Sequence, residues 1–362
     1  MKKIIVSSDS LKPVLDRLEQ AINPRNSGPT ENIYFKVAKG EIELITTDGE
    51  ITIGVRMQAE TAGGPFEMLL PFAYLKDIVK LSKSCPISIE LTGARKAMIL
   101  AEEDEYEATL TKVDDFPELP STPKRNLLKL DNDFVGYLGK ALLTLYKGDD
   151  KPALTKACLD LGKSSTYLVS TDTTCIYKRK INLSSAEDDE LLFSPKMYKA
   201  IEGLQDIELS WTQKLIALKS PNVTVWATRH EGKYVNYKAA YPKFEKNLPL
   251  NKEDFIHALQ KSCLTSDQLK HTTLILKSEQ GKILLETNDT QLGRKIKARS
   301  AGTYTGNVDA VSISAKKMLK SMAQVEGDNI YLHIEDRMQA ILISSDDDED
   351  YLGLIMPLKT DQ

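Results

Sequence analysis

The sequence predicts an α+β fold made of three copies of one domain, because three sets of matching segments recur with a common period. Each segment of the first set has two hydrophobic residues followed by polar residues that end in aspartate. These aspartates are Asp48, Asp172 and Asp289, which are 124 and 117 residues apart. The other two sets keep the same order along the chain, so coincidence is a poor explanation.

The second set opens a helical pattern in each repeat, at Pro71, Pro195 and Ala315, with separations of 124 and 120 residues. The third set stands at the front of each repeat, at Leu11, Phe134 and Phe255, with separations of 123 and 121 residues. A period this long is typical of a repeated domain and not of a solenoid.

Each repeat reads in order as a strand, a helix, strands, a second helix and further strands. Alternation with period two predicts the strands, as in residues 41–44 and 282–285. Apolar spacing near 3.6 predicts the second helices, at Phe72, Leu75 and Val79 and at Met197, Ala200, Ile201 and Leu204. Two helices on one face of each antiparallel sheet form an α+β layer. Linkers at 116–123 and 241–243 divide the chain into domains 1–124, 125–245 and 246–362.

Composition and cysteine usage indicate a cytoplasmic protein. The chain has 362 residues, 41% of them hydrophobic and 28% charged. Its basic and then apolar start is broken after three residues by Ser7, which favours a strand over a signal peptide. No apolar run reaches the length of a membrane span. Four cysteines lie far apart, at Cys85, Cys158, Cys175 and Cys263, which suits reduced thiols better than disulfides or a zinc site.

Lysines follow the apolar stripe of the second helix in every repeat, although the chain has a net charge of −4. These lysines are Lys76, Lys80 and Lys83, then Lys196 and Lys199, then Lys316 and Lys320. The acidic runs 102–105 and 346–350 lie elsewhere, at expected hairpin tips. Lysines on a single helix usually mark a solvated face. Three equivalent helices indicate a shared basic surface that would meet phosphates without sequence preference.

Residue patterns of enzymes are missing from the sequence. The four histidines have no metal-binding spacing, and no nucleophile elbow, P-loop or dinucleotide fingerprint occurs. The repeated aspartates are better explained as turn formers that bond the local backbone. A solvated turn is favoured over a loose cation site for the acidic runs. We therefore expect no catalytic residues, no metal and no cofactor.

In this order and spacing, four short motifs resemble the bacterial DNA polymerase III beta subunit, or sliding clamp, over residues 1–359. They are residues 46–50 (TTDGE), 115–120 (DFPELP), 170–172 (STD) and 354–359 (LIMPLK). The resemblance implies three similar domains per chain, joined head to tail in a homodimer that forms a six-domain ring with helices lining the hole. It also implies that the ring encircles duplex DNA and has the replicative DNA polymerase, the clamp loader and repair proteins as partners.

The resemblance further implies a hydrophobic pocket for partner peptides between the second and third domains. Its apolar wall and tail would be Leu154, Ile176, Leu269, Met338, Leu354, Met356, Pro357 and Leu358. Its edge would be Thr171, Thr173, Thr174, Cys175, Val235, Ala239, Ala240, Ser314 and Lys317. Residues 173–176 (TTCI) stand where the family usually has Gly-His-Arg-Leu, which indicates a divergent or additional clamp.

The resemblance also implies that Tyr106 and Ala108 of one chain lie against Cys263 and Leu264 of the next, at the joint between chains. Two other functions stay open at this point. One is a structural or interaction protein built of the same domains that does not enclose DNA, which the molar mass in solution would distinguish. The other is a hydrolase that uses the acidic clusters, which would show metal-stimulated turnover.

Overall fold

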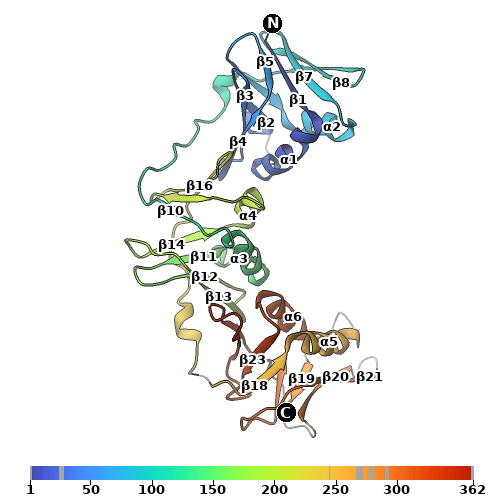
Figure 1. Ribbon diagram of the computed structural model, residues 1–362, viewed down its shortest axis with the longest axis vertical. Coiled ribbons are helices and arrows are strands. Elements are labelled where there is room, and N and C mark those ends of the chain that lie inside the picture. The colour runs from blue at the N-terminus through green and yellow to red at the C-terminus, as the bar shows by residue number, and fades with distance from the viewer. Residues whose placement is uncertain are drawn as a thin grey trace. The chain divides into compact units, whose positions relative to one another are not determined.

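The computed structural model describes residues 2–23, 28–243, 245–265, 272–276, 281–289 and 293–359 (Figure 1). The chain forms two compact units. Unit 1 consists of Met1–Val135 and Ser194–His230, and unit 2 of Gly136–Phe193 and Glu231–Gln362.

Unit 1 contains two antiparallel sheets. The five-stranded sheet has the order β5-β1-β7-β8-β9, with β1 Lys3–Ser7, β5 Glu60–Ala62, β7 Pro86–Gly93, β8 Lys96–Ala101 and β9 Asp104–Thr109. The eight-stranded sheet has the order β10-β15-β16-β17-β4-β3-β2-β6. Its strands are β2 Asn32–Ala38, β3 Glu41–Thr47, β4 Ile51–Gln58, β6 Phe66–Pro71, β10 Leu128–Lys129, β15 Glu208–Trp211, β16 Leu215–Lys219 and β17 Val223–Thr228.

Unit 2 also contains two antiparallel sheets. The eight-stranded sheet has the order β14-β11-β12-β13-β25-β24-β23-β18. Its strands are β11 Ala157–Leu161, β12 Thr166–Thr171, β13 Cys175–Ile181, β14 Asp189–Phe193, β18 Leu248–Asn251, β23 Asn329–His333, β24 Ile341–Ser345 and β25 Gly353–Ile355. The four-stranded sheet has the order β21-β20-β19-β22, with β19 Thr272–Ile275, β20 Lys282–Asp289, β21 Arg294–Ala301 and β22 Ala310–Ile313.

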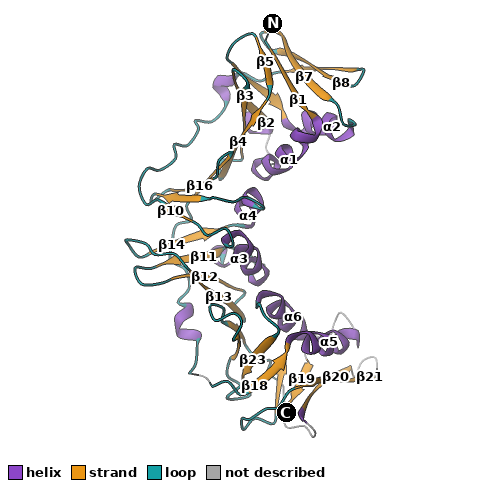
Figure 2. Cartoon of the chain, in the orientation of Figure 1, coloured by secondary structure: helices purple, strands orange, loops and turns teal. Residues whose placement is uncertain are grey.

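Within each unit the α-helices lie on one side of the strands (Figure 2). They are α1 Ser8–Leu18, α2 Phe72–Leu81, α3 Phe134–Ala141, α4 Pro195–Ile201, α5 Lys252–Ser262 and α6 Ala315–Gln324. Side-chain oxygens of Ser7, Ser194, Asn251 and Ser314 cap α1, α4, α5 and α6, because each accepts a bond from an otherwise unpaired backbone N–H. The apolar residues at helical spacing face inward, and Leu11, Leu15 and Leu18 of α1 are all buried.

The strand orders confirm the predicted threefold repeat. Each repeat supplies one group of strands ending in β9, β17 or β25, with five strands in the first repeat and four in the others, and a second, four-stranded group that starts with β4, β13 or β21. The last strand of the second repeat, β17, pairs with β4 of the first, and β25 of the third repeat pairs with β13 of the second. The second repeat thus contributes one group of strands to each unit, so the two units do not coincide with three domains. The boundaries 1–124, 125–245 and 246–362 remain a prediction.

Candidate functional site

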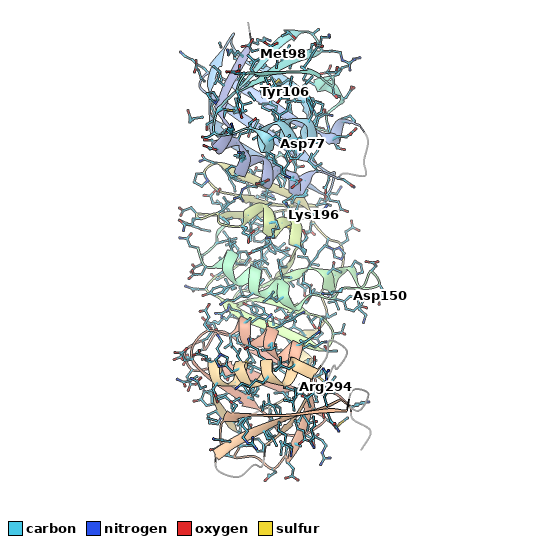
Figure 3. The ribbon with its side chains drawn as sticks, turned by 90° about the vertical axis from the view of Figure 1, so that its right-hand side faces the viewer. Asp77, Met98, Tyr106, Asp150, Lys196 and Arg294 are labelled. Atoms are coloured by element: carbon cyan, nitrogen blue, oxygen red, sulfur yellow. The ribbon has the colours of Figure 1, made fainter. Side chains whose placement is uncertain are left out.

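Several lysines of the expected DNA-facing set are already paired with carboxylates. Lys76 lies 3.1 Å from Asp16 and 2.6 Å from Glu19, both on or directly after α1. On α4, which Figure 3 shows with Lys196 labelled, Lys196 lies 2.5 Å from Asp48 and Lys199 lies 2.8 Å from Glu202. These charges are partly neutralised within the chain.

Other lysines of the set are exposed. They are Lys80 on α2, Lys316 and Lys320 on α6, and Lys83. The expectation that Lys83 lies on the second helix is wrong, because α2 ends at Leu81 and the Lys83 N–H donates to Glu102 Oε1 at 2.7 Å. Lys196 and Lys199 are exposed as well, with 49% and 53% of their side chains accessible.

The first helix adds a cation that the sequence-based prediction did not include. Lys12 of α1 lines a recess with Lys76 and Lys80 of α2, and its amine donates to the Ser82 carbonyl at 3.1 Å. The prediction of a basic surface considered the second helices alone. Lys12 could have been predicted from the sequence, because it directly follows Leu11, a residue of the buried side of the first helix.

The predicted role of the repeated aspartates as turn formers is confirmed for two of them. Asp48 accepts bonds from the N–H groups of Glu50 and Ile51, at 3.0 and 2.9 Å. Asp172 accepts from Thr174 and Cys175, at 2.9 and 2.8 Å. The side chain of Asp289 lies outside the described residues.

Both described aspartates also form an ion pair with the second helix of the following repeat. Asp48 pairs with Lys196 of α4, and Asp172 pairs with Lys317 of α6 at 2.9 Å. Lys317 also bonds the Thr174 hydroxyl. Each pair therefore links a turn of one repeat to a helix of the next, across the sheet where two repeats join.

Removing the charge of Asp172 is expected to give a pH-dependent loss of stability. Partial burial raises the pKa of its carboxyl, but bonds from Lys317, Thr174 and Cys175 outweigh burial and hold the pKa below its usual value. A carboxyl with a lowered folded-state pKa stabilises the fold above the unfolded-state pKa, and this contribution disappears as pH falls through the folded-state pKa. Asp172→Asn should therefore lower the free energy of unfolding by about 1 kcal/mol near neutral pH.

The measurement is urea unfolding of wild type and Asp172→Asn at neutral pH and again below the aspartate range. The difference between the two proteins should shrink at the lower pH. The exposed Asp149→Asn is the matched control. A difference that stays constant with pH would mean that the Asp172–Lys317 pair contributes no stability.

The structure brings part of the expected peptide pocket together in unit 2. Leu154, Ile176 and Leu354 belong to one buried cluster, where Ile176 of β13 lies opposite Leu354 of β25. Tyr234 and Tyr237, which the sequence-based prediction missed, belong to the same cluster. The signal for them is aromatic residues three positions apart just before the second linker.

The edge of the expected pocket mixes exposed and buried groups. Val235, Met338 and Met356 are 43%, 50% and 42% exposed, which is unusual for large apolar side chains. The Thr171 hydroxyl is buried and donates to the Cys175 carbonyl. Burial raises the pKa of the Cys175 thiol to about 11, so the thiol remains protonated.

The remaining pocket residues are more scattered. Thr173, Ala239 and Ala240 are exposed, and Ser314 caps α6. The tail after β25 stays attached to the unit, since Met356 N–H donates to Thr174 and Leu358 N–H to Ser312, both at 2.8 Å. Pro357, between them, is half-buried. Leu269 lies outside the described residues.

The four residues expected at the joint between chains lie at or near open edges. Tyr106 and Ala108 are on β9, the edge strand of the five-stranded sheet, and Leu264 is 75% exposed just after α5. Cys263 beside it is half-buried. Figure 3 labels Tyr106 on β9 and Arg294 on β21, the edge strand of the four-stranded sheet.

The acidic run 346–350 differs from a purely solvated turn. Asp348 is buried and pairs with the buried Arg179 at 2.5 Å, and the Glu326 N–H donates to the same carboxylate. The guanidinium carbon of Arg179 also lies 4.2 Å from the ring centroid of Tyr137. This aspartate thus binds β13 to the loop between β24 and β25. Because both charges are buried, removing either one would leave the other buried without its partner, which is strongly destabilising.

Metal clusters and membrane-spanning helices are both absent from the part of the chain that the structure describes. No group of three or more His, Cys, Asp or Glu side chains there is placed to hold a metal ion. None of the described helices is long and apolar enough to cross a membrane.

Comparison with known proteins gave matches over almost the whole chain. Residues 2–120 match a family model described as DNA polymerase III beta subunit, N-terminal domain, and residues 240–359 match the C-terminal domain of the same subunit. The beta sliding clamp of Bacillus subtilis is 21% identical over 378 residues, which cover 99% of this chain and 100% of the relative. That of Buchnera aphidicola is 21% identical with the same coverage.

Solved structures have the same fold. A crystal structure of the Bacillus subtilis sliding clamp superposes with a TM-score of 0.89 at 19% identity and covers 99% of both chains. The Helicobacter pylori beta clamp bound to a DNA ligase peptide has a TM-score of 0.89 at 18% identity, covering 99% of this chain and 100% of the other.

Proposed function

The chain belongs to the DNA polymerase III beta subunit family, the sliding clamps, and on this premise we propose that it closes as a homodimer into a ring around duplex DNA. The ring tethers the replicative polymerase to DNA, and the clamp loader and repair proteins are its further partners. It catalyses no reaction itself. We place it in the cytoplasm, with clamp domains 1–124, 125–245 and 246–362.

One observation carries ring closure: the same joint occurs twice within the chain, and the strands for a third joint are open. At both internal joints the last strand of one repeat pairs antiparallel with the strand that follows the aspartate turn of the preceding repeat. The corresponding strands that remain are β9 and β21, and each is the edge of its sheet. Since open edges tend to pair, β21 of one copy can accept β9 of a second copy.

The internal joints also give the register of this third joint. Thr52 lies opposite Trp226 and Ile53 opposite Val225. Positions on β4 are matched to positions on β21 by their distance from the aspartate turn. Positions on β17 are matched to positions on β9 by the alternation of buried residues, since Ala227 and Ala108 are both buried. The transfer sets Lys295 against Glu107, Ile296 against Tyr106 and Lys297 against Glu105.

Charge on the two edges agrees with this register. Exposed basic residues on β21 are Arg294, Lys295, Lys297 and Arg299, and exposed acidic residues on β9 are Asp104, Glu105 and Glu107. Within one chain Lys295 and Lys297 share Glu286 of β20, at 2.6 and 3.6 Å, and Glu107 lies 2.6 Å from Lys96 of β8. Opposite charges facing each other stabilise cross-strand pairs, whereas like charges destabilise them. The exposed Leu264 and the 38%-exposed Tyr74 supply apolar area beside the strands, together with the half-buried Cys263.

Molar mass and topology test the ring together. Sedimentation should give twice the 40.4 kDa of one chain. Protein loaded on nicked circular DNA should be released when the circle is cut, because a ring slides off free ends. A monomeric mass, or equal retention on circular and linear DNA, would favour the non-encircling alternative.

Within the ring we propose that the helix lysines face the duplex: Lys76, Lys80, Lys83, Lys196, Lys199, Lys316 and Lys320. Phosphate contact of this kind is sequence-independent and depends on salt. Lys76, Lys196 and Lys199 are offset by carboxylates of the same chain, which supports a graded surface in which the other lysines of the set contribute most to DNA binding.

We further propose that the buried cluster of unit 2 forms the floor of the partner-peptide pocket. The exposed Val235, Met338 and Met356 would then bind the apolar anchor of a partner peptide. Short peptides gain most of their affinity from a few such anchors. The other residues of the pocket set, Leu269 included, remain part of this proposal.

Met356→Ala should weaken partner binding by about 1–3 kcal/mol, the range for truncating an anchor contact. The test is a fluorescence titration with a peptide from the replicative polymerase of the same cell. Dimer mass should not change, because Met356 belongs to neither β9 nor β21. Met338→Ala truncates a second exposed methionine of the set and should weaken binding as well. Wild-type affinity in both variants would exclude this pocket.

A further inference from the structure

Unit 1 carries a second recess where two repeats join. It has a volume of about 270 Å³ and opens over the eight-stranded sheet at the pairing of β17 with β4. Its apolar lining comes from Ile45, Leu119, Pro120 and Trp226. The first linker thus forms one wall and the sheet forms the floor.

This recess is the counterpart, by repeat position, of the pocket proposed in unit 2. Thr52 of β4 lies opposite Trp226, just as Ile176 of β13 lies opposite Leu354. Thr52 lies opposite Thr47, as Ile176 lies opposite Thr171. Thr47 and Thr171 each directly precede the aspartate of their turn. Trp226 therefore occupies the place of Leu354 and puts a larger apolar surface there.

The indole of Trp226 is held in a fixed position. Its Nε1–H donates to the Thr122 hydroxyl of the linker at 3.0 Å. Its ring covers Gly54, where an added Cβ would lie 3.3 Å from a ring carbon. In unit 2 the counterpart of Gly54 is Lys178, whose amine lies 4.6 and 5.0 Å from the ring centroids of Tyr167 and Tyr241. The indole therefore occupies, over Gly54, the place where unit 2 has the side chain of Lys178.

Basic residues surround the recess. Lys36, Arg56 and Lys219 line it, and Glu43, which pairs with Arg56 at 3.1 Å, is the carboxylate among its described lining residues. Within the described part of the chain, Lys36 and Lys219 form no ion pair; the amine of Lys36 lies 5.4 Å from the Tyr34 ring centroid. In a chain of net charge −4, this local excess favours an anionic ligand.

We propose that this recess is a second docking site, which binds an extended acidic peptide segment of a partner protein by an apolar anchor on Trp226. The proposal rests on the clamp function above and adds to it a site at the other internal joint. Single-stranded nucleic acid is less suited, because one tryptophan provides no platform for successive bases. An apolar anchor with flanking carboxylates satisfies both Trp226 and the two unpaired lysines.

The experiment uses the full chain with Trp211→Phe. The sequence has two tryptophans, so this variant retains Trp226 alone. The probe is a short synthetic peptide with a Leu-Phe pair between aspartates, and its matched control carries lysines in place of the aspartates. A saturating change in Trp226 emission is expected with the acidic peptide only. Lys36→Glu together with Lys219→Glu should weaken binding by about tenfold or more, because like charges then face each other.

Lys214→Glu, an exposed change in the turn between β15 and β16, is the matched control and should bind like the parent. Lys36→Gln with Lys219→Gln repeats the test without charge reversal, and circular dichroism checks that each variant folds. Affinity unchanged by both pairs of substitutions, or an emission change with oligothymidine and none with peptide, would overturn the proposal. So would a response abolished by Met356→Ala, which would assign the peptide to the unit 2 pocket alone. Retention on circular DNA is measured in parallel, so that failure of the ring and failure of this site give different results.

Discussion

A chain with Lys295→Glu and Lys297→Glu is expected to sediment as a monomer and to lose its retention on circular DNA. The register of the third joint sets these positions opposite Glu107 and Glu105 of a second copy. Four like-charge pairs would then face each other in the closed ring, two at each of its two joints. Like-charge juxtaposition at an interface costs several kcal/mol, enough to raise the dissociation constant by orders of magnitude.

Restoring the opposite charges makes this test specific. Adding Glu105→Lys and Glu107→Lys to the same chain should recover the dimer, because the pairs are then reversed in sign and complementary again. Lys233→Glu with Lys243→Glu changes the net charge equally at exposed positions away from both edges and should remain dimeric. A dimer that persists in the first variant across a dilution series would exclude the register, since β9 and β21 would not be paired as proposed.

Leu264→Lys examines the same joint without using the strands. The side chain is 75% exposed in the single chain, so the substitution should leave the fold of unit 2 intact. In the dimer the new ammonium would be buried without a partner, which is unfavourable. A weakened dimer in this variant together with the strand variants would indicate one continuous interface.

Features that depend on neighbours in sequence could be predicted from the chain alone. The aspartate turns are local: Asp48 bonds N–H groups two and three residues ahead, so a repeated Thr-Asp pattern was sufficient to locate them. Helix positions followed from apolar spacing and from caps such as Ser194 and Ser314. The threefold repeat then gave the α+β fold, because the period relates whole domains.

Features that depend on distant partners could not be predicted. The sequence pattern predicted that Lys76 and Lys196 belong to a basic surface without carboxylate partners. Their partners are Asp16, Glu19 and Asp48, which lie 57 to 148 residues away in sequence. Asp348 looked like one member of a solvated acidic run, and its burial depends on Arg179, 169 residues earlier. The pairing of β17 with β4 across a predicted domain boundary is also nonlocal, and it is what creates the recess beside Trp226.

Neutralising Lys80, Lys316 and Lys320 is expected to weaken DNA retention far more than neutralising Lys76 and Lys196, whose charges are offset by carboxylates of the same chain. Lys80→Gln, Lys316→Gln and Lys320→Gln remove exposed charges, whereas Lys76→Gln and Lys196→Gln remove charges already offset by Asp16, Glu19 and Asp48. The slope of log K against log salt should fall by about 0.9 for each DNA phosphate that a lysine no longer neutralises. Every substitution acts twice in the ring, because both chains of the dimer carry it.

The measurement is the lifetime of the loaded ring on nicked circular DNA over a range of salt concentrations, with dimer mass checked for each protein. The exposed triple variant should show a short lifetime and a flatter salt dependence, while the paired double variant should stay close to wild type in slope. Lys282→Gln, at the start of β20 and therefore not on a helix, is the matched single control. Equal salt slopes in all of these proteins would mean that the helix lysines do not meet phosphates, because counterion release must follow the number of neutralised phosphates. A flatter slope only in the paired variant would instead mean that Lys76 and Lys196 exchange their carboxylates for phosphates when DNA enters the ring.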